Sequence, residues 1–350
     1  MRATVKDVAA LAGVSPKTVS NVINGVVRVA PATRERVESA LAELDYVPNL
    51  SARGLRNGRT GAIALAFPDL TTPYSAEMSH WFVEVAHERG WSVQLEQTGV
   101  RPERERELLL RGREHLVDGL VLNPVSLGES AIVGAEELPP VVVIGEVEQH
   151  LVDQVRVDSV TAARDMTEHL IALGHRRIAV LGCPGDGFDS ATARARTLGW
   201  SQAMTAAGLP VGDDLRWACR AWEPEAGAAT VADALARGEA PDALFCFTDS
   251  LAIGAVHALW SAGLRVPDDV SVAGFDDIAD GRFTRPPLTT VRLDKRLFAE
   301  RTLELLAARI ADRDRAPELA VIPHEVVPRA STARRPPRPA EPAAPSAPSA

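Results

Sequence analysis

Residues 4–25 read TVKDVAALAGVSPKTVSNVING, and this stretch decides the fold of the N-terminal part of the chain. Thr4 followed by Asp7 is a helix-start pattern of the capping-box kind, because each side chain can accept the backbone N–H of the other residue. Gly13 breaks this first helix. Ser15-Pro16 then starts a second one, since serine caps exposed N–H groups and proline needs no N–H partner in the first turn. Two short helices joined by a glycine-containing turn predict a helix-turn-helix unit.

A third helix should follow from Pro31. Apolar residues recur on one stripe of this segment, at Val37, Ala40, Leu41 and Leu44. Ala30 stands where a polar cap is expected, so we expect a weaker helix start here. The sequence therefore predicts an all-α headpiece over residues 1–48, followed by a polar, basic connector.

The second predicted helix carries residues suited to reading DNA. In a helix-turn-helix unit the first residues of the second helix meet base edges in the major groove. Lys17 can donate to guanine and Asn21 can make a two-point contact with adenine, whereas Ser15, Thr18 and Ser20 suit phosphate contacts. The alternative is a helical hairpin inside another kind of protein, with Lys17 and Asn21 merely solvated.

The distribution of charge supports a polyanionic partner for the headpiece alone. The whole chain carries a net charge of −9. Residues 1–59 contain nine Lys and Arg against five Asp and Glu, which gives +4 and leaves −13 for the rest. A basic module on an acidic body indicates that the headpiece, and not the body, binds a polyanion such as DNA.

From residue 61 to about 330 the chain alternates apolar strands with helical segments. The expected strands are Gly61–Phe67, Ser92–Leu95, Gly119–Leu122, Val141–Ile144, Arg177–Leu181, Ala243–Phe247 and Val270–Phe275. The expected helices are Tyr74–Arg89, Pro102–His115, Thr161–Leu173, Ala191–Ala207, Pro224–Ala236 and Leu251–Ala262. This alternation predicts parallel sheets covered on both faces. Some 270 residues exceed the needs of one such sheet, so we expect an α/β core of two doubly wound lobes with a cleft between them.

Several other function classes find no support in the sequence. The three cysteines are far apart and predict neither disulfides nor a zinc site. We find no nucleophile elbow, phosphate loop, HExxH or paired CxxC motif, so we expect no enzyme, no cofactor and no metal. No apolar run approaches a membrane span, and the N-terminus lacks the apolar core of a signal peptide, so we expect a cytoplasmic protein. A transport-type binding protein would need the opposite: a secretion signal and no DNA-reading head.

The motifs together resemble the LacI/GalR family of bacterial repressors over about residues 3–330. The matching motifs are Asp7-Val8-Ala9, Ala12-Gly13-Val14-Ser15, Thr18-Val19-Ser20, Thr33-Arg34-Glu35-Arg36-Val37, Leu44-Asp45-Tyr46-Val47-Pro48-Asn49 and Ala52-Arg53-Gly54-Leu55. The expected DNA contacts, from both arguments, are Thr4, Ser15, Pro16, Lys17, Thr18, Ser20, Asn21, Asn24, Asn49, Ala52, Arg53 and Leu55. Many family members carry arginine where this chain has Asn21, and Pro16-Lys17 occupies the family's specificity positions. The operator sequence therefore cannot be transferred from a relative.

The resemblance implies that residues 49–59 form a hinge whose helix folds on the operator. Gly54 weakens an isolated helix by roughly 1 kcal/mol relative to alanine, so this short helix should be unfolded off DNA. The resemblance also implies that two Leu55 side chains wedge into the minor groove, with Ala52 and Arg53 in the same contact. An apolar wedge unstacks a base step and kinks the duplex. The alternative is that Leu55 packs on the core.

The resemblance further implies a core like that of periplasmic sugar-binding proteins, closing around a ligand. Its expected ligand contacts are Tyr74, Arg196, Trp222, Asp249 and Asp276. Asp276 follows a strand end, where open α/β sheets bind ligands. Asp249 is equally explained as a helix cap, and Trp222 as a core residue. Asp158 and Lys295 are weaker candidates that surface salt bridges would explain.

An arginine, a carboxylate and an aromatic ring fit a sugar or polyol, although a purine stays open because family members bind purines too. The implied protein is a homodimer on a near-palindromic operator, controlled by the small molecule. We expect an N-lobe over about 60–158 and 292–320, and a C-lobe over about 159–290 and 321–330. Residues 331–350, rich in Pro, Ala, Ser and Arg, should be a disordered tail.

Overall fold

The computed structural model describes residues 3–24, 28–46, 59–126, 130–133, 135, 137–185 and 189–335. The chain divides into two compact units, Met1–Thr60 and Gly61–Ala350. The predicted hinge falls almost wholly on residues 47–58, which lie outside the described residues. Within the described ranges, no helix has both the length and the apolar content needed to cross a membrane.

The first unit contains the three predicted helices, α1 (Val5–Ala12), α2 (Pro16–Asn24) and α3 (Pro31–Glu43). The capping box of α1 is confirmed: the Thr4 side chain accepts the Asp7 N–H, and the Asp7 carboxylate accepts the Thr4 N–H. Gly13 ends α1 in the left-handed conformation, with φ 62°. Ala30 makes no side-chain cap bond to α3, as predicted. The three helices bury one small apolar cluster, made of Val8, Ala9, Ala12, Val19, Val22, Val37 and Ala40.

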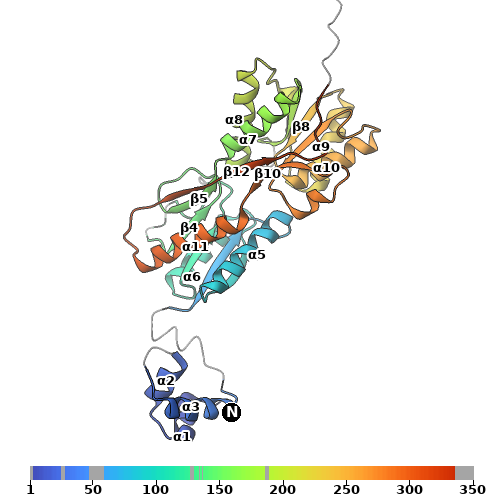
Figure 1. The fold of residues 1–350 in the computed structure, drawn as a ribbon. Helices are drawn as coiled ribbons and strands as arrows, with labels where there is room; N and C mark the ends of the chain where they lie inside the picture. The colour runs from blue at the N-terminus through green and yellow to red at the C-terminus, as the bar shows by residue number, and fades with distance from the viewer. Residues whose placement is uncertain are drawn as a thin grey trace, which may run out of the picture. The chain divides into compact units, whose positions relative to one another are not determined.

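The second unit contains two six-stranded sheets (Figure 1). The N-lobe sheet has the order β11-β5-β4-β3-β1-β2, and all its pairings are parallel. Its strands are β1 (Ala62–Phe67), β2 (Ser92–Gln97), β3 (Gly119–Leu122), β4 (Val141–Ile144), β5 (Asp153–Val157) and β11 (Leu319–Ile322). Its helices are α5 (Pro73–Glu88), α6 (Pro102–Arg113) and α11 (Lys295–Ala311). The central strand β4, VVVI, is buried at every residue, as expected for a parallel strand covered on both faces.

The C-lobe sheet has the order β12-β10-β9-β8-β6-β7. Its strands are β6 (Ile178–Cys183), β7 (Arg216–Ala218), β8 (Ala243–Cys246), β9 (Ser271–Phe275), β10 (Thr289–Leu293) and β12 (His324–Val327). Its helices are α7 (Ser159–Ala172), α8 (Ala191–Ala206), α9 (Pro224–Ala236) and α10 (Asp249–Ser261), with short 3₁₀ turns η1 (Asp213–Leu215) and η2 (Ala279–Arg282). Only the β10–β12 pairing among the described strands is antiparallel.

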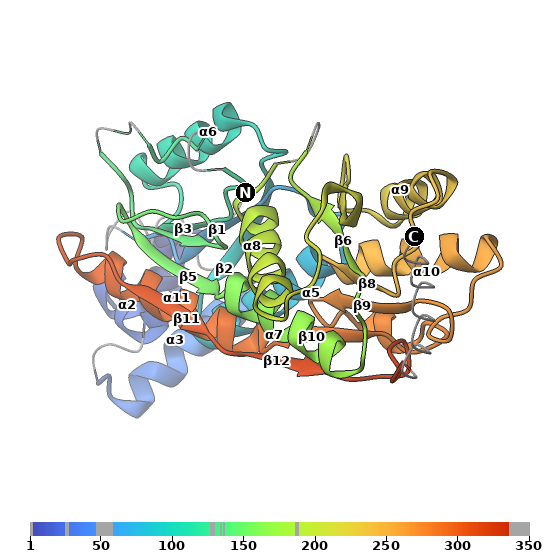
Figure 2. The same cartoon turned by 90° about the horizontal axis from the view of Figure 1, so that it is seen from above.

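The chain passes between the lobes after β5, after β10 and after β11 (Figure 2). β11 pairs with β5 through Ile322, so the last crossing falls two residues later than the predicted boundary at residue 320. Strand–helix alternation could not reveal β5, β7, β10, β11 and β12. β7 is short, and β11 and β12 follow each other with only Pro323 between them.

The C-terminal boundary also needs correction, because residues 331–335 belong to the C-lobe and not to a disordered tail. Ser331 is fully buried. Its hydroxyl donates to the Val272 carbonyl at 2.6 Å and accepts the Thr289 N–H at 2.7 Å. The Arg335 N–H donates to the Leu173 carbonyl at 2.8 Å. The composition of this segment predicted disorder because it has few apolar residues, but hydrogen bonds and not apolar burial hold the segment to the C-lobe.

Candidate functional site

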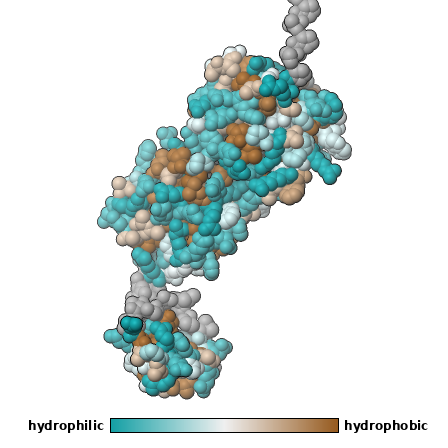
Figure 3. All heavy atoms as spheres, viewed as in Figure 1, coloured by the Kyte–Doolittle hydropathy of each residue, from teal (hydrophilic) through white to brown (hydrophobic). Residues whose placement is uncertain are grey.

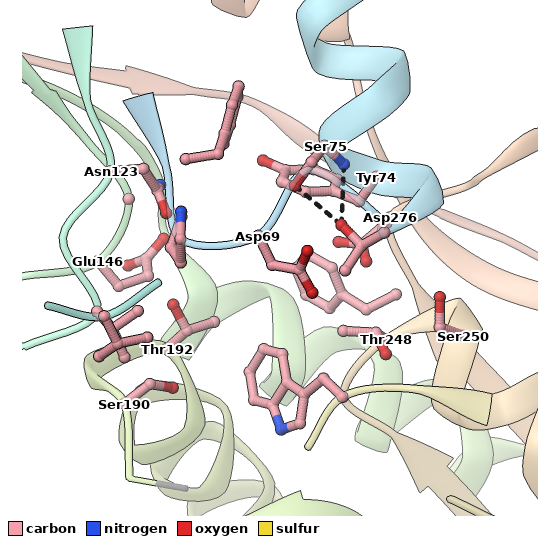
Figure 4. A pocket seen from close by; sticks show the side chains of 18 of the residues that line it. Asp69, Tyr74, Ser75, Asn123, Glu146, Ser190, Thr192, Thr248, Ser250 and Asp276 are labelled. Atoms are coloured by element: carbon pink, nitrogen blue, oxygen red, sulfur yellow. Dashed lines mark hydrogen bonds between the residues drawn. The ribbon is translucent and has the colours of Figure 1, made fainter. Parts of the chain in front are cut away.

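A cavity of about 400 Å³ lies between the two lobes (Figure 4). On the N-lobe side its wall comes from the residues that follow β1, β3 and β4, among them Asp69, Asn123 and Glu146. On the C-lobe side it comes from the starts of α8 and α10 and from the residues after β9. The cavity therefore sits at the carboxyl ends of parallel strands, where open α/β sheets bind small molecules.

Arg196, on α8, is held at several points in this cavity. Its side chain is buried, with only 7% of the residue exposed. One guanidinium nitrogen donates to the Phe247 carbonyl. The guanidinium carbon lies 3.4 Å from the centre of the Phe275 ring and 5.8 Å from that of Trp222, so the cation stacks on one aromatic face and lies near another. These contacts fix the orientation of Arg196 before any ligand arrives.

Asp276 follows β9 in a backbone conformation that non-glycine residues rarely adopt, with φ 111°. Such outliers concentrate at functional sites, where surrounding structure holds the strain. Burial raises the pKa of the Asp276 carboxyl to about 7, although the nearby charges of Arg196 and Lys295 oppose this rise. The side chain lines the cavity and its carboxylate is available to accept hydrogen bonds from a ligand.

Tyr74 and Trp222 also line the cavity, together with Phe275. Tyr74 is the second residue of α5, at the N-lobe side, and burial raises the pKa of its phenol. Trp222 comes just before α9 in the C-lobe. Four of the five predicted effector contacts, Tyr74, Arg196, Trp222 and Asp276, are thus brought to one cavity from separate parts of the sequence.

Asp249, the fifth, lies behind the cavity wall. It is completely buried, and its carboxylate accepts the Ile278 N–H at 2.9 Å and the Thr290 hydroxyl at 2.6 Å. Both oxygens are therefore used inside the protein. The cap of α10 is Thr248, whose side chain accepts the Leu251 N–H. The expected direct contact is corrected to a positioning role: Asp249 fixes the loop that follows Asp276.

The two weaker candidates have structural roles too. Asp158 caps α7 by accepting the Thr161 N–H and hydroxyl. Lys295 donates to Glu77 at 2.7 Å and to the Asp277 carbonyl at 3.0 Å, and it does not line this cavity. Neither residue takes part in a salt bridge on the surface. Asp158 bonds to the first turn of its own helix, and Lys295 is buried where it pairs with Glu77.

Sequence reasoning missed polar residues of the cavity wall, notably Asp69, Asn123, Glu146, Ser190 and Thr192 (Figure 4). Asn123 directly follows β3 and Glu146 comes two residues after β4. These residues could have been found from their positions, because polar residues just beyond the carboxyl ends of parallel strands face the ligand crevice. Within the described ranges, no three His, Cys, Asp or Glu residues gather as metal ligands.

In the headpiece, α2 presents the predicted DNA-reading residues on its outer side. Pro16 and Lys17 are exposed, and Thr18, Ser20 and Asn21 are half-buried. Val19 and Val22 face the opposite way, into the headpiece core. Ser15 accepts the Thr18 N–H at 3.1 Å, and their hydroxyls lie 2.9 Å apart, so the helix start is fixed. The exposed residues of α2 are arranged as a helix-turn-helix unit requires.

The remaining predicted DNA contacts are placed as follows. Thr4 caps α1 and is exposed. Asn24 is the last residue of α2, and its side chain lies outside the described part of the structure. Asn49, Ala52, Arg53 and Leu55 also lie outside the described residues. Their roles stay predictions from the sequence.

Comparisons with known proteins cover both units. Residues 4–49 match the family of bacterial regulatory proteins, lacI family, and residues 167–332 match the periplasmic binding protein-like domain. The HTH-type transcriptional repressor PurR of Histophilus somni (strain 129Pt) is 34% identical over 333 residues, covering 94% of this chain and 98% of that protein.

Two solved structures are similar over almost the whole chain. The lac repressor dimer bound to operator and the anti-inducer ONPF is 30% identical with a TM-score of 0.83, covering 95% of this chain and 100% of that one. A complex of the transcriptional regulator CelR with cellobiose is 31% identical with a TM-score of 0.67, covering 94% and 100%. These relatives are regulators of transcription and not enzymes, and they confirm the predicted headpiece and two-lobed core. The chain belongs to the LacI family of bacterial regulatory proteins and is a DNA-binding transcriptional repressor.

Proposed function

We propose that a sugar, bound in the cavity between the lobes, controls the affinity of this repressor for its operator. The observation that carries the proposal is that Asp276, Arg196 and Trp222 line the same cavity. A carboxylate accepts hydrogen bonds from hydroxyls, a guanidinium donates to ring and hydroxyl oxygens, and an indole covers the apolar face of a pyranose. Asn123, Ser190 and Thr192 add further hydrogen-bonding groups around the same space.

A purine is the second candidate. The rings of Tyr74, Trp222 and Phe275 line the same cavity and could enclose a planar base. The resemblance to the family also implies purines among its effectors. We favour the sugar because Asp276, Arg196 and Thr192 line the cavity with groups that ring hydroxyls can pair with, and a buried polar group left unpaired costs binding free energy.

We further propose that the protein is a homodimer on a near-palindromic operator, acting on DNA in the bacterial cytoplasm. The two-fold symmetry of a dimer matches two operator half-sites. Trp260 is 75% exposed and Phe283 is 84% exposed, both in the C-lobe, and aromatic side chains of this kind are enriched in the interfaces between protein chains. Over the face shown in Figure 3, apolar residues gather in separate areas of the core amid a mostly polar surface.

Control of DNA binding would pass through the lobes to the hinge. A ligand that favours one lobe arrangement favours or melts the hinge helices, so effector and operator affinities are linked reciprocally. Glu77 of α5 accepts the Ala279 N–H of the C-lobe at 2.7 Å, so the two lobes are in direct contact beside Asp276. Residues 276–279 connect the cavity wall to this contact, so they are a route by which a ligand on Asp276 would change the contact between the lobes.

The test is thermal-shift screening of the full chain against neutral sugars, polyols and purine bases, since a ligand that binds only the folded state raises Tm. Hits are then added to the complex with DNA sites that the purified protein selects from random sequence, and release is followed by fluorescence anisotropy. Asp276→Ala is the matched variant: it should lose the ligand response and keep DNA binding. A response only to purines, or one that Asp276→Ala leaves intact, would contradict the sugar site.

A further inference from the structure

The charged side chains around the effector cavity are strongly unbalanced. Its described wall contains four carboxylates, from Asp69, Glu146, Glu223 and Asp276, and one cation, Arg196. Neither lysine nor histidine is among these wall residues. A site built for a phosphate or carboxylate ligand normally supplies an excess of cations or free N–H donors. This wall supplies the opposite excess.

The single cation is also largely committed to the protein. Arg196 donates to the Phe247 carbonyl and lies on the Phe275 ring, and its nearest carboxylate contact is with Asp276 at 3.9 Å. Asp276 and Glu146 both interact electrostatically with this one guanidinium. Lys295 acts on Asp276 and Arg156 acts on Glu146 from outside the wall, so within the wall itself one positive charge faces both carboxylates.

Glu146 places a second, half-buried carboxyl group in the cavity wall. Burial raises the pKa of its carboxyl, and the opposing influences come from Arg196, Ser159 and Arg156. An incoming anion would enter this low-dielectric space beside Glu146 and Asp276. It would be repelled by their ionised forms or would require them to hold their protons, and either one costs binding free energy.

Helix N-termini do not reverse this balance. α5, α7, α8, α9 and α10 begin at the cavity, and each start carries a partial positive charge. Thr72, Asp158, Ser190 and Thr248 each accept one first-turn N–H, in α5, α7, α8 and α10. The start of α9 has no side-chain cap, and the Glu223 carboxylate stands at it. The dipoles of these starts act on wall carboxylates that are already in place, and Glu223 stands at the start that no side chain caps.

We infer that the effector carries no anionic group: it is a neutral or amine-bearing sugar, and phosphorylated or acidic sugars are rejected by the wall carboxylates. This inference rests on the proposed sugar site and adds the charge class of its ligand. Hydroxyl and ammonium groups donate hydrogen bonds to carboxylates, so such a ligand uses the same acidic wall that repels a phosphate.

The test compares matched pairs of probes at fixed ionic strength by thermal shift and calorimetry on the full chain. The pairs are glucose with glucose 6-phosphate, galactose with galactose 6-phosphate and ribose with ribose 5-phosphate, together with cellobiose and glucosamine. We expect the phosphate of any binding sugar to bind at least ~100-fold more weakly than the sugar, given the cost of placing like charges side by side.

Two variants separate local repulsion from the overall negative charge of the core. Asp69→Asn combined with Glu146→Gln should narrow the sugar-to-phosphate ratio by about 10-fold or more, because it removes two of the nearby charges. Asp268→Asn removes one exposed carboxylate outside the cavity wall and should leave the ratio unchanged.

Each result bears on a distinct claim. A sugar phosphate that binds as tightly as its sugar overturns the charge inference and leaves the sugar site standing. Binding by adenine or guanine alone overturns the sugar site, and comparing these bases with AMP and GMP then decides the charge inference by the same ratio. The inference is also overturned if the ratio of sugar affinity to sugar-phosphate affinity is the same in the double variant as in the wild type. If none of the sugars, sugar phosphates and bases binds, the proposed sugar site and the charge inference are both contradicted.

Discussion

Arg196 and Asp276 face each other in the cavity, with 3.9 Å between Nη2 and Oδ1, and both residues are more than nine-tenths buried. This separation is too long for a direct hydrogen bond, so the carboxylate keeps its capacity to accept from a ligand. Phe275 and the Phe247 carbonyl hold the guanidinium in place. The pair is thus a preformed donor and acceptor with room for a hydroxyl between or beside them.

Ionisation of Asp276 should make the unliganded protein less stable as the pH rises. Its folded-state pKa of about 7 lies above the ordinary value of 3.8 because of burial, so the folded form holds this proton more tightly than the unfolded form. The destabilisation therefore develops between these two values and persists above them. Asp276→Asn cannot ionise, so its stability advantage over the wild type should grow by roughly 3 kcal/mol as the pH rises from about 5 to about 8. Denaturant unfolding at both pH values measures this, and an identical difference at both would contradict it.

Leu55→Ala should weaken operator binding far more than nonspecific DNA binding. The wedge predicted from the sequence acts only at the centre of a specific site, whereas nonspecific affinity comes from phosphate contacts. Anisotropy titrations on a selected operator and on a scrambled duplex measure the two affinities. An equal loss on both duplexes would exclude the wedge, and Leu11→Ala, an exposed leucine on α1, serves as the control.

The two helix starts of the headpiece should respond in opposite directions to substitution. Thr4→Ala removes a complete capping box and should destabilise the headpiece by about 1 kcal/mol. Ala30→Ser supplies a cap that α3 lacks, at a residue whose backbone is already non-helical (φ −55°, ψ 137°), and should stabilise the headpiece by a similar ~1 kcal/mol. Hydrogen exchange of the α1 and α3 amides in the full chain reports each change. A shift of the same sign in both variants would refute the capping argument.

Glu77→Gln should loosen the contact between the lobes. The carboxylate accepts from the Ala279 N–H and from Lys295, which is only 8% exposed. An amide cannot neutralise that buried ammonium, so the free energy of unfolding of the variant should be lower by roughly 1–3 kcal/mol. The variant should therefore unfold at a lower denaturant concentration. Glu84→Gln, on the exposed side of the same helix, is the matched control. If both variants unfold together with the wild type, the contact contributes nothing.

Ser331→Ala should destabilise the C-lobe although the segment looks like a disordered tail in composition. The change leaves the Thr289 N–H and the Val272 carbonyl without their buried partner. The expected cost is about 1–3 kcal/mol in denaturant unfolding. Ser261→Ala, which removes an exposed hydroxyl bonded to the His257 carbonyl, should be nearly silent. Equal effects at Ser331 and Ser261 would show that burial does not matter here.

Local chemistry determined much of this protein directly from the sequence. Thr4 with Asp7, Gly13 and Ser15-Pro16 act within one helical turn, so their pattern predicted the helix boundaries of the headpiece. The alternating strands and helices likewise predicted two parallel sheets, and the motifs predicted the family. Arg196, Trp222 and Asp276 came from that resemblance, which carries long-range information that periodicity lacks.

Tertiary structure alone decided the rest, because it depends on residues distant in sequence. Glu146 and Asn123 line the same cavity only because β3 and β4 end at the same edge of one sheet. Asp249 is withdrawn from the cavity since Ile278 and Thr290, far along the chain, occupy its oxygens. Ser331 is ordered by Val272 and Thr289. The sequence by itself determined the elements and the family, whereas the charge balance of the cavity wall emerged only when two sheets brought their strand ends together.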